Sequence, residues 1–192
     1  MINFNDAVAL AREKSPRLLA IDGLPVSGKS TLAERLEREL GATTVYLDDF
    51  VLPEGEWRHK VRPGLPFPYI AYDAFVDVVE TLAQGQVARY QRYDWSTGRA
   101  GAWRVVEPLG LITIEGVSVL NPDLSRLYDL RFWVESDAQT TLAASLSRGV
   151  GDWEQEWREL FMPSVALYLE TRPQAWADHL VAGRDAGQQS GA

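Results

Sequence analysis

The segment that most constrains this chain is Gly23-Leu-Pro-Val-Ser-Gly-Lys-Ser30, which matches the pattern G-x-x-x-x-G-K-[ST] in full. A short apolar run, residues 17–22, precedes it, and in residues 29–40 leucine and alanine recur at helical spacing. The glycines let the backbone wrap closely around an anion, and the start of the following helix adds N–H groups and positive potential. The segment therefore predicts a strand, a phosphate-binding loop and a helix in that order.

Each polar residue of this loop has an expected task. Lys29 is expected to bridge the outer phosphates of a nucleotide, and Ser30 to hold Mg²⁺. The residues predicted to bind ATP are Gly23, Pro25, Ser27, Gly28, Lys29, Ser30 and Thr31. The alternative is a tight turn with no ligand, but the complete motif between a strand and a helix favours a nucleotide-phosphate site.

Apolar runs and amphipathic segments alternate along the rest of the chain. We expect buried strands at residues 17–22, 43–47, 109–115, 129–135 and 177–182. We expect helices at residues 5–14, 29–40, 72–82, 140–148 and 153–171, the last with a kink at Pro163. Strands that are apolar on both faces and alternate with helices indicate a parallel sheet covered on both sides. The prediction is an α/β fold, a doubly wound, mostly parallel five-stranded sheet of the P-loop nucleoside-triphosphate-hydrolase type.

Two segments interrupt this alternation. Residues 50–69 are rich in proline and read as a long loop, and loops of this length in a compact domain are usually functional. Residues 86–106 contain aromatic residues around a Ser-Thr-Gly turn and predict a β-hairpin beside the main sheet. We expect one domain over residues 1–192, with a core at about 17–182, a helical lid and a polar, frayed tail at 183–192.

Composition excludes several functions. The 19 basic and 27 acidic side chains give a net charge of −8, which is unfavourable for binding a phosphate backbone. There is no cysteine and there are two histidines, so disulfides and thiolate zinc sites are excluded. No apolar run approaches membrane-spanning length, and the first residues do not resemble a signal peptide. We expect a cytoplasmic protein with a small-molecule partner, without nucleic acid or membrane, and a homo-oligomer stays open.

Acidic residues end two of the expected strands. Asp48 follows the strand at 43–47, and Glu115 ends the strand at 109–115. The carboxyl ends of parallel strands face the ligand crevice, so both carboxylates are expected beside the phosphate loop. There Asp48 can accept a proton from an attacking hydroxyl, and Glu115 can join Ser30 around Mg²⁺. The plainer alternative for each is an acidic residue in a surface turn.

The phosphate loop alone does not distinguish a kinase from other nucleotide-binding enzymes. A GTPase needs an N/T-K-x-D segment, and none of the three lysines lies in one. A small-molecule kinase needs a base, an acidic Mg²⁺ partner, an acceptor pocket and a positively charged lid. The chain offers a candidate for each, with Arg148 as the lid cation that would clamp the phosphates together with Lys29.

Four segments resemble the uridine kinase-like group of P-loop kinases, which includes pantothenate, nicotinamide riboside and phosphoribulo-kinases. The phosphate loop resembles the family's loop, and Asp48-Asp49-Phe50 resembles its D-x-F motif. Glu115-Gly116-Val117 resembles its E-G strand end, and residues 172–178 resemble its approach to the last strand. Residues 72–75 and 93–95 resemble its acceptor helix and acceptor hairpin more weakly. The resemblance spans about residues 17–182.

The resemblance implies that Asp48 is the catalytic base and that Asp49, Asp73 and Tyr93 contact the acceptor. The chain departs from the family at the lid, where several arginines are reduced to Arg148, with Arg158 further along the chain. Fewer cations mean weaker stabilisation of the transferring phosphoryl group. Arg99 or Arg104 on the hairpin could supply the missing charge.

Six of the seven tryptophans fall into two expected groups. Trp57, Trp95 and Trp103 are expected to flank the acceptor pocket. Trp153, Trp157 and Trp176 are expected in the core, because they lie at helical spacing. The function favoured by the sequence is ATP-dependent phosphorylation of a hydroxyl on a small metabolite, with a nucleoside as the favoured acceptor. The alternatives are a kinase of a sugar, pantothenate or nicotinamide riboside, and a non-catalytic ATP-binding regulator.

Overall fold

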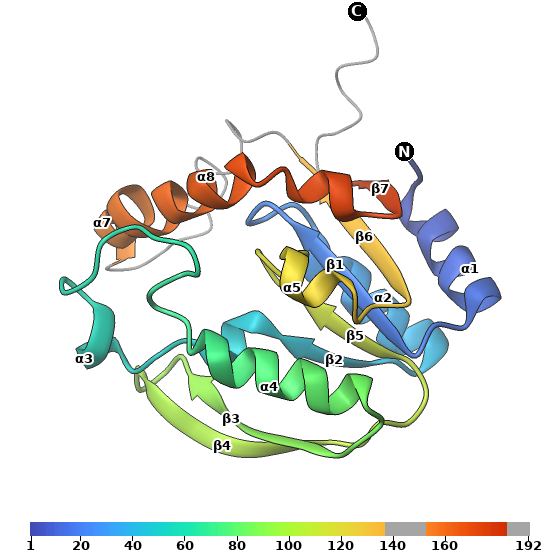
Figure 1. Ribbon diagram of the computed structural model, residues 1–192, viewed down its shortest axis with the longest axis horizontal. Helices are drawn as coiled ribbons and strands as arrows, with labels where there is room; N and C mark the ends of the chain where they lie inside the picture. The colour runs from blue at the N-terminus through green and yellow to red at the C-terminus, as the bar shows by residue number, and fades with distance from the viewer. Residues whose placement is uncertain (137–152, 184–192) are drawn as a thin grey trace, which may run out of the picture.

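A five-stranded parallel sheet forms the frame of the protein, as seen in a computed structural model that describes residues 1–136 and 153–183 (Figure 1). The strands lie in the order β2-β5-β1-β6-β7. Their bounds are β1 Leu18–Gly23, β2 Thr43–Tyr46, β5 Ile112–Glu115, β6 Leu130–Glu135 and β7 His179–Ala182. Each neighbouring pair is parallel, and helices cover both faces, so the predicted doubly wound α/β fold is confirmed.

The central strand β1 shows why the sheet must be covered on both sides. Side chains along a strand point alternately to its two faces. Leu18 and Ala20 pack into the apolar core on one face, and Leu19 and Ile21 pack into the core on the other. All six residues of β1 are buried. A strand with apolar side chains on both faces is stable only between two covering layers.

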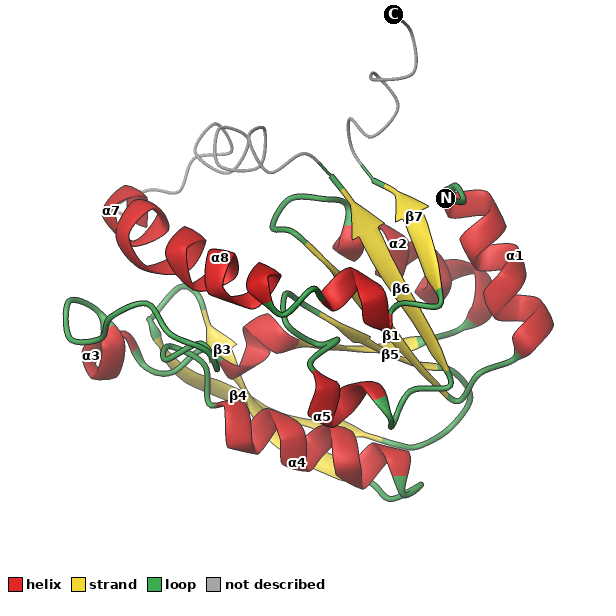
Figure 2. Ribbon diagram, turned by 45° about the horizontal axis from the view of Figure 1, so that its top comes forward, coloured by secondary structure: helices red, strands yellow, loops and turns green. Residues whose placement is uncertain are grey.

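The helices form these two layers (Figure 2). α1 (Phe4–Lys14) and α2 (Lys29–Leu40) cover one face. α4 (Tyr72–Ala83), the short α5 (Pro122–Ser125) and α8 (Met162–Glu170) cover the other. The helix predicted over residues 29–40 has these bounds, and the left-handed Gly41 ends it by donating its N–H to the Glu37 carbonyl.

The segment after β2 leaves the sheet and builds a separate unit. It contains a 3₁₀ turn, η1 (Leu47–Phe50), a single helical turn, α3 (Glu54–Trp57), and the rest of the predicted loop. The predicted hairpin is present as β3 (Ala88–Asp94) and β4 (Arg99–Val106), paired antiparallel beside α4 (Figure 1). This unit lies at the carboxyl end of β2 and reaches the crevice above the sheet.

The chain returns to the sheet through an irregular helical stretch. α7 (Glu154–Glu156) continues into a π-helical turn, Trp157–Phe161, then α8, and a 3₁₀ turn at Pro173–Trp176 leads to β7. The irregularity expected at Pro163 is therefore a π turn just before that residue. The helix expected at residues 140–148 and the tail after residue 183 lie outside the described residues. Among the helices of the described residues, none is both long and apolar enough to span a membrane.

Candidate active site

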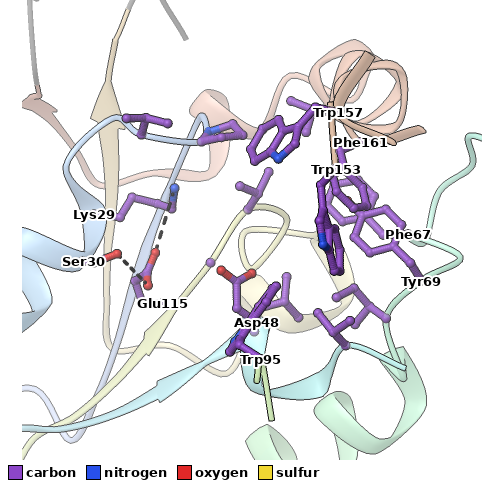
Figure 3. Close-up of a pocket in the computed structure, with 18 residues that line it drawn as sticks. Lys29, Ser30, Asp48, Phe67, Tyr69, Trp95, Glu115, Trp153, Trp157 and Phe161 are labelled. Carbon is purple, nitrogen blue, oxygen red and sulfur yellow. Dashed lines mark hydrogen bonds and ion pairs between the residues drawn. The ribbon is translucent and has the colours of Figure 1, made fainter. Parts of the chain in front are cut away.

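A cavity of about 330 Å³ opens above the carboxyl ends of the central strands. The phosphate loop, η1, the end of β5, the hairpin turn and the π-helical stretch all contribute to its walls. Figure 3 shows Lys29, Ser30 and Glu115 on one side of it, aromatic rings on the other, and Asp48 between them. The sequence analysis singled out Lys29, Ser30, Asp48 and Glu115 at three separate places in the chain. All four line this one cavity.

The loop from Gly23 to Lys29 has a backbone that few residues adopt. Gly23 has a φ of 149° and Gly28 a φ of 109°, and a Cβ at Gly23 would collide with the Val134 carbonyl of β6. Val26 also has a positive φ, 62°. No side chain caps the N-terminus of α2, so its first N–H groups have no side-chain acceptor. This is the arrangement expected of a loop that surrounds phosphate groups.

Lys29 is held inside the protein although it carries a charge. Its side chain is 7% exposed, and Nζ donates a hydrogen bond of 2.8 Å to the Leu24 carbonyl. Nζ also lies 3.9 Å from Oε1 of Glu115. A buried ammonium needs such partners, and these two fix it at the base of the cavity. From there it can reach an anion bound on the loop.

Glu115 connects β5 to the phosphate loop. Its Oε2 accepts a hydrogen bond of 3.4 Å from the Ser30 hydroxyl. Burial, opposed by Lys29 and assisted by the nearby Asp48, raises the pKa of the Glu115 carboxyl to about 7. A hydroxyl beside a carboxylate is a set of hard oxygen donors that fits Mg²⁺, which takes one or two protein oxygens and completes its shell with water and phosphate. The described residues contain no cluster of three or more acidic, histidine or cysteine side chains that could hold a metal alone.

Asp48 faces the open cavity from η1 (Figure 3). Its side chain is accessible from the cavity, but protein surrounds it on the remaining sides. This crowding raises the pKa of the Asp48 carboxyl, with Lys29 lowering it and Asp49 adding to the rise. A carboxylate with a raised pKa is a stronger proton acceptor at neutral pH. Asp48 therefore has both the access and the basicity to take a proton from a bound hydroxyl.

The glycine after Glu115 allows these two carboxylates to approach each other. A Cβ at Gly116 would collide with the Cβ of Leu47, the residue before Asp48. Only a glycine lets the end of β5 contact η1 so closely. The E-G pair noted in the sequence therefore has a steric cause here.

The structure does not bring three predicted acceptor residues to this cavity. Asp49 is 5% exposed and accepts hydrogen bonds from Arg92 Nε and the Tyr90 hydroxyl, both at 3.0 Å. It lines a second hollow together with Tyr93, and Asp73 lines a third at the start of α4. Asp49 thus anchors the hairpin to η1 in the described structure.

Of the cations expected near the lid or as substitutes for it, Arg104 and Arg158 are paired, Arg99 is exposed and does not line the cavity, and Arg148 is not described. Arg148 lies outside the described residues. Arg104 lies 3.5 Å from Asp49, and Arg158 pairs with Glu154 at 2.8 Å. Within residues 1–136 and 153–183, Lys29 is the sole cationic side chain that lines the cavity.

Two predictions about tryptophans were wrong. Trp57 was expected at the pocket, but it is fully buried in the core, where its indole N–H donates to the Leu52 carbonyl. Trp153 and Trp157 were expected in the core, but they line the cavity, and Trp176 is 42% exposed. Trp153 and Trp157 belong to the irregular helical stretch, and their side chains face the cavity. Trp95 lines the cavity as expected, whereas Trp103 lines the second hollow.

Sequence reasoning missed the aromatic wall of the cavity. Phe67, Tyr69 and Phe161 join Trp153 and Trp157 in this wall. The signal was the four-residue spacing of Trp153, Trp157 and Phe161.

The residue before the phosphate loop was also missed. Asp22 is fully buried, and its Oδ2 accepts a 2.6 Å hydrogen bond from the Tyr168 hydroxyl of α8. An acidic residue in an apolar strand was the available signal for that link.

Known proteins with similar sequences are nucleoside kinases by name. No family model matches the chain. Over 148 residues it is 26% identical to a uridine kinase of Clostridium perfringens, a match that covers 72% of this chain and 71% of that protein. Over 147 residues it is 27% identical to uridine kinase-like protein 4 of Arabidopsis thaliana, covering 71% of this chain. The chain spans only 30% of the length of the Arabidopsis protein.

Solved structures agree on the fold. A possible uridine kinase from Bacillus stearothermophilus matches with a TM-score of 0.69 and 18% identity, over 92% of this chain and 98% of that one. A candidate fructose transport system kinase from Silicibacter sp. matches with a TM-score of 0.63 and 21% identity, over 94% of this chain and 99% of that one. At these identities the likeness concerns the fold alone.

Fold, site and relatives together support a small-molecule kinase with an α/β architecture of the P-loop type. Among such kinases, they support the uridine kinase-like family. Kinase relatives imply ATP as the phosphate donor and a small molecule as the acceptor.

Proposed function

We propose that the protein transfers the γ-phosphoryl group of ATP to a hydroxyl of a small metabolite, with a nucleoside as the favoured acceptor. The observation that carries the proposal is the meeting of Asp48, Lys29, Ser30 and Glu115 in one cavity. A base next to a phosphate-binding loop is what transfer to a hydroxyl requires.

The reaction follows from these positions. The acceptor oxygen attacks the γ-phosphorus, the bond to the β-γ bridging oxygen breaks, and ADP leaves. The proton of the acceptor hydroxyl passes to the Asp48 carboxylate, which later releases it to solvent. Lys29 and the N–H groups of the loop stabilise negative charge on the phosphates. Ser30 and Glu115 would hold Mg²⁺, which supplies charge neutralisation on the phosphates when it is bound.

The names of the sequence relatives favour a nucleoside, since they are uridine and uridine-cytidine kinases. The solved structure named for fructose keeps a different acceptor as the second candidate within the same mechanism. The cavity volume, about 330 Å³, suits either a nucleoside or a sugar as the acceptor.

The test is an acceptor panel. The protein is incubated with Mg-ATP and separate nucleosides, nicotinamide riboside, pantothenate and sugars, and products that gain one phosphate are detected by mass spectrometry. Lys29→Ala is the blank. A phosphorylated nucleoside that is absent from the blank supports the proposal, and a different phosphorylated acceptor moves it to the second candidate. ATP binding with no product from any acceptor would contradict a kinase and favour the regulator.

A further inference from the structure

The carboxylate of Asp22 lies near the end of β1, one residue before the phosphate loop. Leu18 and Ala20 precede it on the same face of the strand and pack into the apolar core under α4, α5 and α8. Asp22 is fully buried. A buried charge is costly unless donors surround it, so the partners of this carboxylate indicate what it does.

Four hydrogen-bond donors from the described part of the chain converge on this carboxylate. Its Oδ1 accepts from the N–H of Gly23 at 2.6 Å and the N–H of Ser118 at 3.3 Å. Its Oδ2 accepts from the N–H of Leu120 at 2.8 Å and the hydroxyl of Tyr168 at 2.6 Å. Since all four partners donate, they favour the charged carboxylate over the neutral acid.

The segments that carry these donors also form walls of the cavity. Gly23 begins the phosphate loop. Residues 116 and 117, which line the cavity, come directly before Ser118. Val165, which lines the cavity from α8, lies about one helical turn before Tyr168. The carboxylate therefore joins the phosphate loop to two other walls of the cavity, although it does not line the cavity itself.

The backbone after β5 is bent toward Asp22. Ser118 has a φ of 81°, which is unfavourable for a residue with a side chain. Its N–H and that of Leu120 both donate to the carboxylate. An unfavourable conformation of this kind persists only where its surroundings hold it. The two hydrogen bonds to Asp22 supply this hold, so the path of the chain after Glu115 depends on the carboxylate.

The charge of Asp22 by itself opposes the binding of phosphate. Burial raises the pKa of the Asp22 carboxyl, and the positive charge of Lys29 is near enough to counteract the rise. A negative charge close to the phosphate loop repels the phosphate groups of a nucleotide. An acidic residue here therefore favours nucleotide binding only if its hydrogen bonds outweigh this repulsion.

We propose that Asp22 is a positioning residue for the nucleotide. Its carboxylate holds the start of the phosphate loop, the segment after Glu115 and α8 in the arrangement that binds the phosphates. Tyr168 shares this role, because its hydroxyl ties α8 to the carboxylate. Asp22 acts through the backbone that it holds and is not itself a phosphate ligand. The inference rests on the ATP binding of the proposed function.

The experiment measures nucleotide affinity apart from folding stability. Titration calorimetry with Mg²⁺ and a non-hydrolysable ATP analogue is carried out at a temperature where each variant is folded by circular dichroism. Asp22→Asn should weaken binding about tenfold, the scale of one lost charge-assisted hydrogen bond. Tyr168→Phe should weaken it about threefold. Adding Tyr168→Phe to Asp22→Asn should have little further effect, since the two changes act on one contact.

The matched control is Thr44→Val. Thr44 of β2 and Thr113 of β5 are fully buried, and the Thr113 hydroxyl donates a 2.6 Å hydrogen bond to the Thr44 hydroxyl. Neither residue lines the cavity. The variant should lose stability on the scale of Tyr168→Phe but bind the analogue within about twofold of the parent. It therefore separates a loss of stability from a loss of position.

The pattern across the variants decides the matter. Weaker binding by Asp22→Asn and Tyr168→Phe, with Thr44→Val close to the parent, supports positioning. Tighter binding by Asp22→Asn, the result of charge repulsion alone, would overturn the inference. Unchanged binding, or equal losses in all three variants, would overturn it as well. If Asp22→Asn does not fold, Tyr168→Phe against Thr44→Val gives the same decision.

Transfer is assayed separately with the acceptor panel. A parent that transfers phosphate and variants that bind the analogue as the parent does would remove the inference and leave the kinase. Weakened binding in Asp22→Asn and Tyr168→Phe, with no transfer by the parent to any acceptor, would keep the inference and remove the kinase. A parent that binds no nucleotide would overturn both.

Discussion

The Nζ atom of Lys29 lies 3.9 Å from Oε1 of Glu115, and both side chains are buried, at 7% and 8% exposed. The two residues come from different motifs, 86 positions apart in the sequence, and meet at the base of one cavity. A buried pair of this kind places a titratable carboxyl beside the site where phosphate charge is expected. The protonation state of Glu115 therefore links folding stability and ligand binding.

Glu115→Gln should flatten the pH dependence of stability in the ligand-free protein. The pKa of the Glu115 carboxyl is raised from 4.5 to about 7 in the folded state. Between these values the native state holds a proton that the unfolded state has released, so stability falls as pH rises through this window. Above pH 7 this contribution is constant. Relative to the parent, the variant should gain on the order of 2 kcal/mol between pH 4.5 and 7.5.

Urea unfolding of both proteins at several pH values checks this expectation. Some slope should persist in the variant, because burial also raises the pKa values of Asp48 and Asp22. Parallel stability curves for the parent and Glu115→Gln would show that Glu115 titrates as an ordinary carboxyl.

Glu156→Gln should destabilise the protein more than the control variant Glu154→Gln. Glu156 is 4% exposed and accepts a 2.8 Å hydrogen bond from Arg58 Nε, which joins the loop after η1 to α7. Loss of this charge should cost roughly 1–3 kcal/mol. Glu154→Gln removes an exposed pair with Arg158 and should cost less than about 0.5 kcal/mol. Denaturant melts measure both, and equal losses would contradict a structural role for the buried pair.

Asp22→Asn should loosen the connection between the phosphate loop and α8. The Asp22 carboxylate accepts hydrogen bonds from the backbone N–H groups of Gly23, Ser118 and Leu120 and from the Tyr168 hydroxyl. An amide can accept at one of its two positions only, so at least one buried donor loses its partner. The cost should be about 1–3 kcal/mol in urea unfolding. Tyr168→Phe, which removes one donor, is the milder comparison, and a larger loss there than in Asp22→Asn would contradict this account.

The sheet and the phosphate end of the site could be predicted because their signals are local. An apolar run such as residues 18–23 has few stable arrangements, and the glycines at 23 and 28 fix a loop conformation by sterics alone. Asp48 and Glu115 followed from their places at strand ends, since parallel strands present those ends at one edge.

The aromatic end could not be predicted because its orientation depends on packing. Trp153 and Trp157 share the spacing of an ordinary buried helix face, but both side chains line the cavity. The sequence predicted the same place for Trp57 and Trp95, beside the acceptor pocket. Trp57 is instead fully buried, whereas Trp95 is exposed at a hairpin turn. The partners of Asp49 are 41 and 43 positions away, so its buried hydrogen bonds left no mark in its own segment.

The most direct test of the central claim uses the Asp48→Asn variant and the acceptor found in the panel. Phosphoryl transfer to that acceptor and the binding of Mg-ATP are both measured. Asparagine has the same shape but cannot take the proton, and loss of a general base typically lowers turnover by about 10²–10⁴-fold. We expect ATP affinity within about twofold of the parent and turnover reduced by at least about a hundredfold. Unchanged turnover in Asp48→Asn would contradict the assignment of Asp48 as the base, and with it the mechanism built on this cavity.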